Sequence, residues 1–145
     1  MELKKLPVGV EDFCEMITKK FYYVDKSIMI KELLDLKGKV NLFTRPRRFG
    51  KTLNMSMLQY FFEISEENIK EIFSDLKIAH AGEQYMKYQG KYPVINLTLK
   101  GAKQANFEYA ILSIKRAISS EFQRHRKEGL KIAFCKKNCL VKVKK

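Results

Sequence analysis

The residues with the clearest chemical potential are Gly50, Lys51 and Thr52, which stand between an apolar segment and a helical pattern. In a loop that binds phosphate, backbone N–H groups converge on the anion, and the following helix directs its positive end at it. Gly50 would let the backbone approach closely, Lys51 would neutralise phosphate charge, and Thr52 would ligate Mg²⁺. The triplet therefore predicts a site for a nucleoside triphosphate such as ATP.

One departure weakens this prediction, because Arg45 stands where such a loop normally has its first glycine. A Gly-Lys-Thr triplet is also frequent by chance. Two alternatives therefore stay open at this point. In the first, Gly50 serves an ordinary turn and Thr52 only begins a helix. In the second, the arginines of the turn form a basic patch for nucleic acid, namely Arg45, Arg47 and Arg48.

The elements around the triplet must hold it between a strand and a helix. Residues 39–44 have the β-branched and aromatic content of a short strand, and residues 92–100 alternate Ile95, Leu97 and Leu99 on one face. Helical spacing of apolar residues predicts helices over residues 8–21, 28–38, 51–63, 65–73, 82–91 and 106–127. Strands separated by helices predict an α/β fold with parallel pairing.

The net charge of +13 is concentrated near the C-terminal end, where residues 124–145 contain nine Lys or Arg and one acidic residue. Such a tail attracts polyanions without specificity, although a solvated end is the simpler interpretation. A zinc site is not expected, because Cys135 and Cys139 lack a second pair of ligands. The sequence has neither an apolar run of membrane-spanning length nor a signal-peptide core, so we expect a cytoplasmic chain that does not enter a membrane.

Longer motifs carry a family resemblance. They are "RPRRFGKT" followed by "LNMSMLQYFF", the segments "LPVGVEDFCEMI" and "YYVDKSIMIKELL" before the loop, and "YMKYQGKYPVINLTLK" after it. Together they span residues 5–123 and resemble the AAA-ATPase-like family of predicted ATPases. In that family the first glycine of the loop is characteristically replaced, so Arg45 fits the family pattern.

The resemblance implies a divergent P-loop that binds ATP and Mg²⁺, as in STAND-type P-loop ATPases. Asp25 is implied to help shape the nucleotide site, although capping of the helix over residues 28–38 explains this carboxylate equally well. Arg47 and Arg48 would contact phosphate, with a partner contact or simple exposure to water as alternatives. Thr52 would hold Mg²⁺ together with the nucleotide. The implied nucleotide-binding residues are Arg47, Arg48, Phe49, Gly50, Lys51, Thr52 and Asp25.

The resemblance also implies the fold, a partial three-layer P-loop NTPase sandwich of the additional-strand (ASCE) class. In that family the acidic Walker B strand comes later than this sequence reaches, and members are usually longer, often with a PD-(D/E)XK nuclease-like domain at the C-terminus. We therefore expect a fold truncated before the Walker B strand. Residues 1–126 would form the AAA-ATPase-like portion and residues 127–145 a basic divergent tail, whose composition suggests an early stop or a frame change.

Without the middle strand, residues 39–44 and 92–99 cannot pair as in the family, and unpaired buried backbone groups are costly. We therefore expect a marginally stable, re-paired or oligomeric chain that binds ATP. Since hydrolysis also needs a Walker B acid, enzyme activity is left open, with weak or no turnover expected. The alternatives are a basic module that binds nucleic acid with steep salt dependence, and a remnant without function.

Overall fold

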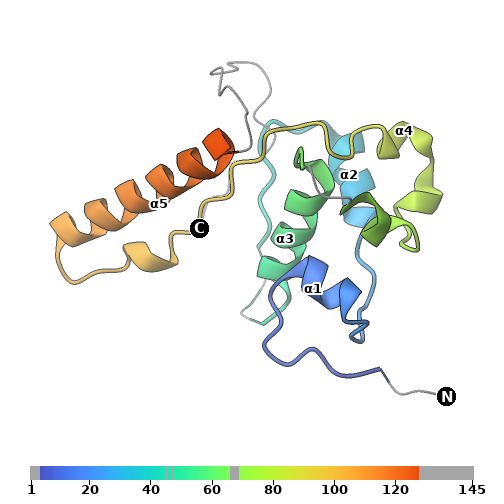
Figure 1. Ribbon diagram of the computed structural model, residues 1–145, viewed down its shortest axis with the longest axis horizontal. Coiled ribbons are helices and arrows are strands. Elements are labelled where there is room, and N and C mark those ends of the chain that lie inside the picture. The colour runs from blue at the N-terminus through green and yellow to red at the C-terminus, as the bar shows by residue number, and fades with distance from the viewer. Residues whose placement is uncertain (1–3, 45, 47, 66–68, 128–145) are drawn as a thin grey trace. The chain divides into compact units, whose positions relative to one another are not determined.

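The computed structural model describes residues 4–44, 46, 48–65 and 69–127, and the chain divides into two compact units (Figure 1). The first unit ends at Tyr92 and the second begins at Pro93. The first unit contains α1 (Phe13–Thr18), α2 (Ile28–Leu36), α3 (Lys51–Phe62), the 3₁₀ helices η1 (Ile69–Phe73) and η2 (Ala79–Ala81), and α4 (Glu83–Met86). The second contains η3 (Lys100–Ala102) and α5 (Phe107–Lys127).

The first helix, α1, is shorter than the helix predicted over residues 8–21. Gly9 has a φ of 77°, a left-handed conformation that interrupts a helix before it begins. Asp12 then caps α1, because its carboxylate accepts a hydrogen bond of 2.8 Å from the backbone N–H of Glu15. After the helix ends at Thr18, Lys20 adopts a φ of 54° and turns the chain away.

The core of the first unit forms around α3. Phe61 of α3, Phe13 of α1 and Phe73 of η1 are fully buried, and the Phe73 ring centroid lies 5.3 Å from each of the other two. α3 packs against both α1 and η1, while α2 packs against α4. The buried residues of α3 all lie in its second half, and they are Met57, Leu58, Phe61 and Phe62. The first turn of α3, with Lys51 and Thr52, is exposed.

The predicted α/β architecture is wrong. The described residues contain helices but no strand or sheet, so they do not form the three-layer P-loop sandwich of the ASCE class. Residues 39–44 are irregular, and residues 92–99 contribute only an isolated parallel bridge between Glu63 and Tyr92. In that bridge the Ile64 N–H donates to the Tyr92 carbonyl at 3.0 Å, and the Tyr92 N–H donates to the Phe62 carbonyl at 2.9 Å.

The second unit shows why residues 93–99 form no ladder. Side chains of α5 occupy backbone groups that a neighbouring strand would otherwise pair. Arg124 donates to the Val94 carbonyl at 2.8 Å, and the Asn96 N–H donates to the Glu121 carboxylate at 2.7 Å. The carbonyl of buried Val94 thus has a partner without a neighbouring strand, and the exposed Asn96 N–H is paired as well.

Candidate functional site

The turn before α3 has an unusual backbone. Gly50 is the N-cap of α3, with φ 69° and ψ 23°, and its carbonyl accepts the first helical hydrogen bond, from the Asn54 N–H at 2.9 Å. Arg48 also has a φ of 69°, which is uncommon for a residue with a side chain. No other described atom lies within 4 Å of the place where a Cβ on Gly50 would stand. The glycine is therefore required by its left-handed conformation and not by crowding.

The first turn of α3 combines positive charge with uncapped helix geometry. Gly50 has no side chain to cap the helix, and the first turn contains no acidic residue. Instead Lys51 occupies the first helical position, Thr52 follows it, and Arg48 lies two residues before Gly50, all three being exposed. A cation at the positive end of a helix dipole destabilises the helix by roughly 0.3–1 kcal/mol. An anion bound at this turn would interact favourably with the same helix dipole.

The structure places the remaining predicted site residues differently. Phe49 is 57% exposed within the turn. Arg45 and Arg47 lie outside the described residues. Asp25 bonds two main-chain amides, with Oδ1 accepting from the Ser27 N–H at 2.8 Å and Oδ2 accepting from the Lys77 N–H at 2.7 Å. Asp25 therefore links the turn before α2 to the backbone at Lys77. A role of Asp25 in shaping a nucleotide site stays a prediction.

A polar network that ties α1 to α3 was not predicted. Beyond capping α1, Asp12 accepts from the Tyr60 hydroxyl at 2.9 Å and from the Ser56 hydroxyl at 3.3 Å. The Ser56 oxygen in turn accepts from the Phe13 N–H at 3.0 Å. The network fixes α3, the helix that begins with Lys51, against the start of α1. The Asp-x-x-Glu pattern at residues 12–15 was a visible signal for the cap, but not for the bonds to α3.

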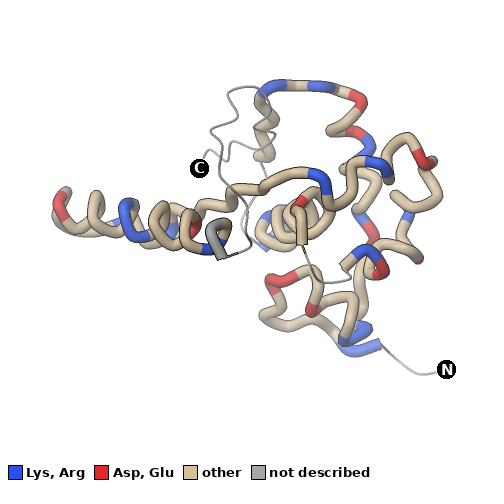
Figure 2. The backbone as a smooth tube through the Cα atoms, turned by 45° about the horizontal axis from the view of Figure 1, so that its top comes forward, with Lys and Arg blue, Asp and Glu red and all other residues tan. Residues whose placement is uncertain are grey.

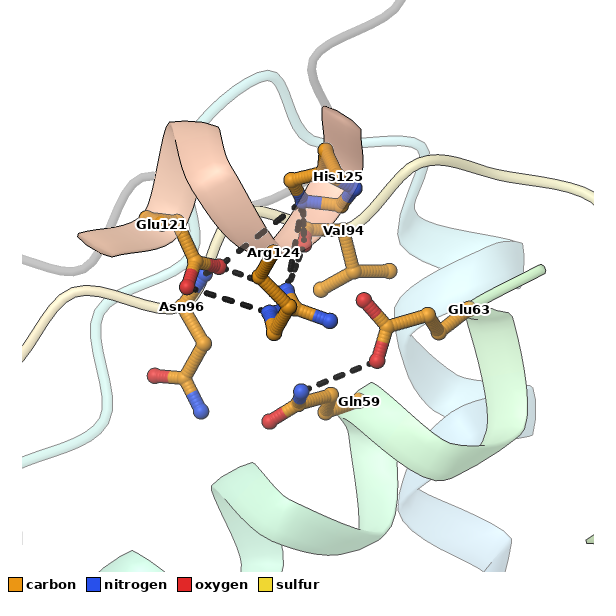
Figure 3. Close-up of polar contacts among 7 residues, drawn as sticks. All are labelled: Gln59, Glu63, Val94, Asn96, Glu121, Arg124 and His125. Atoms are coloured by element: carbon orange, nitrogen blue, oxygen red, sulfur yellow. Dashed lines mark hydrogen bonds and ion pairs between the residues drawn. The ribbon is translucent and has the colours of Figure 1, made fainter. Parts of the chain in front are cut away.

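Figure 3 shows a second polar cluster, at the end of α5, together with the bond from Gln59 to Glu63 near the end of α3. In the α5 cluster, Arg124 bonds both carboxylate oxygens of Glu121, at 2.6 and 3.1 Å. His125 is buried, and its Nε2 lies 2.8 Å from the Val94 carbonyl, a geometry that requires a hydrogen on Nε2. Burial acts to raise the pKa of Glu121, but the bonds from Arg124 and the Asn96 N–H outweigh it and lower the pKa overall.

The lowered pKa of Glu121 gives a pH prediction. Because the folded state favours the carboxylate, this contact contributes stability above the ordinary pKa of the group and loses it as pH falls through the folded pKa. The backbone amide of Asn96 donates to Glu121, so its NMR chemical shift should titrate with a midpoint below the ordinary value of 4.5. In Glu121→Gln that titration should disappear. A midpoint at or above 4.5 in the unmodified chain would contradict the assignment.

Other kinds of site find no support in the part of the chain that the structure covers. No group of three or more His, Cys, Asp or Glu there could hold a metal ion. None of the helices in the described ranges combines the length and apolar composition needed to cross a membrane. Cys135 and Cys139 fall outside the described residues, as does the lysine-rich end from residue 128. Nucleic-acid binding through that end therefore stays a prediction.

Comparison with known proteins assigns this chain to a family. An uncharacterized protein from the vnfD 5′ region of Azotobacter chroococcum mcd 1 is 29% identical over 102 residues. The match covers 70% of this chain but only 18% of that protein, so the chain corresponds to a small part of its relative. No solved structure matches. The family model described as "Predicted AAA-ATPase" matches residues 7–141, and the chain therefore belongs to the predicted AAA-ATPase family.

Proposed function

We propose that the turn at residues 45–52 and the first turn of α3 bind the phosphates of ATP as a divergent P-loop. The observation that carries the proposal is the left-handed Gly50 at the N-cap of α3, followed directly by Lys51 and Thr52. A left-handed residue followed by a helical one turns successive N–H groups toward the same side, which creates a concave site for an anion. The 12 residues of α3 add the positive end of a helix dipole at the same place.

The proposal gives each residue of the turn a defined contribution. Lys51 supplies an ammonium group to the terminal phosphates, and Arg48 adds a second cation beside them. Phe49 and Gly50 contribute only backbone amides, so the Phe49 side chain is not itself a ligand. The hydroxyl of Thr52 is suited to hold Mg²⁺ together with phosphate oxygens, since Mg²⁺ prefers oxygen ligands and keeps several waters. When bound, the ion would neutralise phosphate charge.

Family membership supports a nucleotide over another anion as the ligand of this turn. We assign binding, and not hydrolysis, to these residues. Hydrolysis also needs an acidic residue at the metal and a group that orients water, and residues 45–52 contain no acidic residue. Asp25 holds the turn before α2, where both of its carboxylate oxygens accept main-chain hydrogen bonds.

The test is the affinity for ATP of the unmodified chain and of Lys51→Ala, measured by titration of a fluorescent ATP analogue with Mg²⁺ present. Loss of a charged contact to phosphate should weaken binding by at least about tenfold. Circular dichroism of both proteins checks that the substitution leaves the fold intact. An affinity equal to that of the unmodified chain would remove the turn from consideration.

Lys91→Ala is the matched control, because Lys91 is also exposed but lies at the other end of α3. The residues on either side of it, Gly90 and Tyr92, donate to the carbonyls of Phe61 and Phe62. Lys91→Ala removes the same charge from the same unit and should change affinity by less than about twofold. Removing Mg²⁺ with a chelator should weaken binding to the unmodified chain, and Thr52→Ala should reduce that dependence on Mg²⁺.

A further inference from the structure

The helix α5 has an apolar stripe that the rest of its unit leaves exposed. The stripe consists of Phe107, Ile111, Ile118 and Phe122, whose exposed fractions run from 37% to 77%. With 3.6 residues per turn, these four side chains lie within a narrow sector along the helix. The stripe is thus a continuous apolar surface more than three turns long, and it is the kind of surface that binds another apolar face.

A neighbouring sector of α5 is already covered by its own unit. Ser113 lies so close to Gly101 that its hydroxyl oxygen is 3.0 Å from the place of a Cβ on that glycine. Further along, Glu121 and Arg124 bond the backbone of residues 94–96. Residues 93–102 therefore cover one side of α5, and the stripe lies along the edge of that side. On the other edge of the stripe stand Glu108 and Lys115.

Glu108 and Lys115 determine which kind of partner suits the stripe. They are seven residues apart, so they lie on the same side of the helix about two turns from each other. Both are exposed, and no salt bridge is found for either within the described ranges. Along α5 an acidic position therefore precedes basic ones on the way to the C-terminal end (Figure 2). A second copy of α5 that runs in the opposite direction therefore presents Lys115 near Glu108 and Glu108 near Lys115.

We propose that the α5 stripe binds the α5 stripe of a second copy of this chain, with the two helices antiparallel. Centring the pair between Ile111 and Ile114 packs Phe107 of one copy against Ile118 of the other. The same register places Glu108 of each copy beside Lys115 of the other, which gives two equivalent ion pairs by two-fold symmetry. In a parallel pair the edge with Glu108 and Lys115 would lie on opposite sides of the contact in the two copies, so neither residue would gain an ion pair.

The length of the stripe sets the strength of this dimer. In this register Phe107, Ile111 and Ile118 of each copy lie within the contact, whereas Phe122 lies beyond its end. Three large apolar side chains per copy bury less area than a standard protein interface, so the dimer should dissociate on dilution in the micromolar range, on the order of 1–100 µM. The proposal does not depend on nucleotide binding, since α5 and the turn before α3 belong to different units. Failure of the dimer proposal would leave the proposed ATP site unaffected. Failure of the ATP site would likewise leave the dimer proposal unaffected.

The first test measures the mass of the complete chain by sedimentation velocity from about 1 to about 100 µM. The mass should rise from one chain toward two across this range. Ile118→Asp should weaken the dimer by at least about tenfold, because it places a charge against Phe107 of the other copy. Leu112→Asp is the matched control, because Leu112 is 41% exposed against 39% for Ile118 but lies on another side of α5. It should leave the dissociation constant unchanged.

The second test reverses the charges at the edge of the stripe and does not disturb the apolar residues. Glu108→Lys and Lys115→Glu should each weaken the dimer by about tenfold, since each creates two like-charge contacts. The double variant should return to within about threefold of the unmodified chain. A single-chain mass at every concentration would overturn the proposal. Equal effects of Ile118→Asp and Leu112→Asp, or a double variant as weak as the single ones, would overturn it as well.

Discussion

Replacing Phe73 with Ala is expected to destabilise the first unit by about 3–5 kcal/mol. Phe73 is fully buried, and its ring packs on Phe13 of α1 and on Phe61 of α3. Its removal takes away contacts with both helices at once and leaves a cavity between them. Since a domain of this size has a free energy of unfolding of only about 5–15 kcal/mol, the loss would leave little margin.

Urea denaturation followed by circular dichroism measures this effect as a shift of the unfolding midpoint. Phe43→Ala serves as the control, because Phe43 is the same residue type in the same unit but is 41% exposed. We expect it to lower the free energy of unfolding by less than about 1 kcal/mol. Similar midpoints for the two variants would mean that the aromatic cluster does not carry the stability of the first unit.

The two longest helices, α3 and α5, were the part of the fold that local sequence could predict best, whereas the helix predicted over residues 82–91 is only the short α4, Glu83–Met86. α5 was predicted over residues 106–127 and spans Phe107–Lys127, and α3 was predicted over residues 51–63 and spans Lys51–Phe62. Apolar spacing in residues 51–63 predicts Leu53, Met57, Tyr60 and Phe61 as the buried side of α3. Met57 and Phe61 are buried, whereas Leu53 and Tyr60 are half-buried and Leu58 is buried as well. Helical spacing identifies a sector, whereas the partners of the helix decide how far that sector extends.

The strands were the part that local sequence could not predict. Alternation of Ile95, Leu97 and Leu99 indicates a strand only if another segment pairs with it, and pairing is a long-range property. In the structure Ile95 and Leu99 are 44% and 42% exposed, so the alternation does not mark a face buried in a core. The competing bonds from Arg124 and Glu121 come from residues about thirty positions later, which no local pattern reveals.

The left-handed conformation of Gly50 was predictable because it follows from the residue type, whereas the left-handed conformation of Arg48 was not. A glycine before a helical pattern predicts a residue that can turn left-handed, and Gly50 does so at the N-cap of α3. The binding roles of Lys51 and Thr52 stay predictions until they are measured. By contrast, the bonds from Asp12 to Ser56 and Tyr60 join positions 44 and 48 residues apart. Only the capping role of Asp12 could be inferred from the sequence.

Asp12→Ala is expected to destabilise the first unit by about 2–4 kcal/mol. The substitution removes the N-cap of α1, a contribution of about 1 kcal/mol, and also the acceptor for the hydroxyls of Ser56 and Tyr60. Ser56 and Tyr60 are half-buried, so the loss of a hydrogen-bond acceptor there is costly. Asp12→Asn keeps an oxygen that can cap α1, so it should cost less than Asp12→Ala, as urea denaturation of both variants would show.

A double-mutant cycle separates the link between α1 and α3 from the cap. Tyr60→Phe removes one hydroxyl from the network and should cost about 1 kcal/mol in the unmodified chain, but almost nothing when Asp12 is already Ala. A coupling energy of about 1 kcal/mol would show that the carboxylate acts on α3 as well as on α1. Additive effects would mean that Asp12 only caps α1. In that case the orientation of α3 against α1, and with it the position of Lys51, would depend mainly on the aromatic cluster and on the bond from the Phe13 N–H to Ser56.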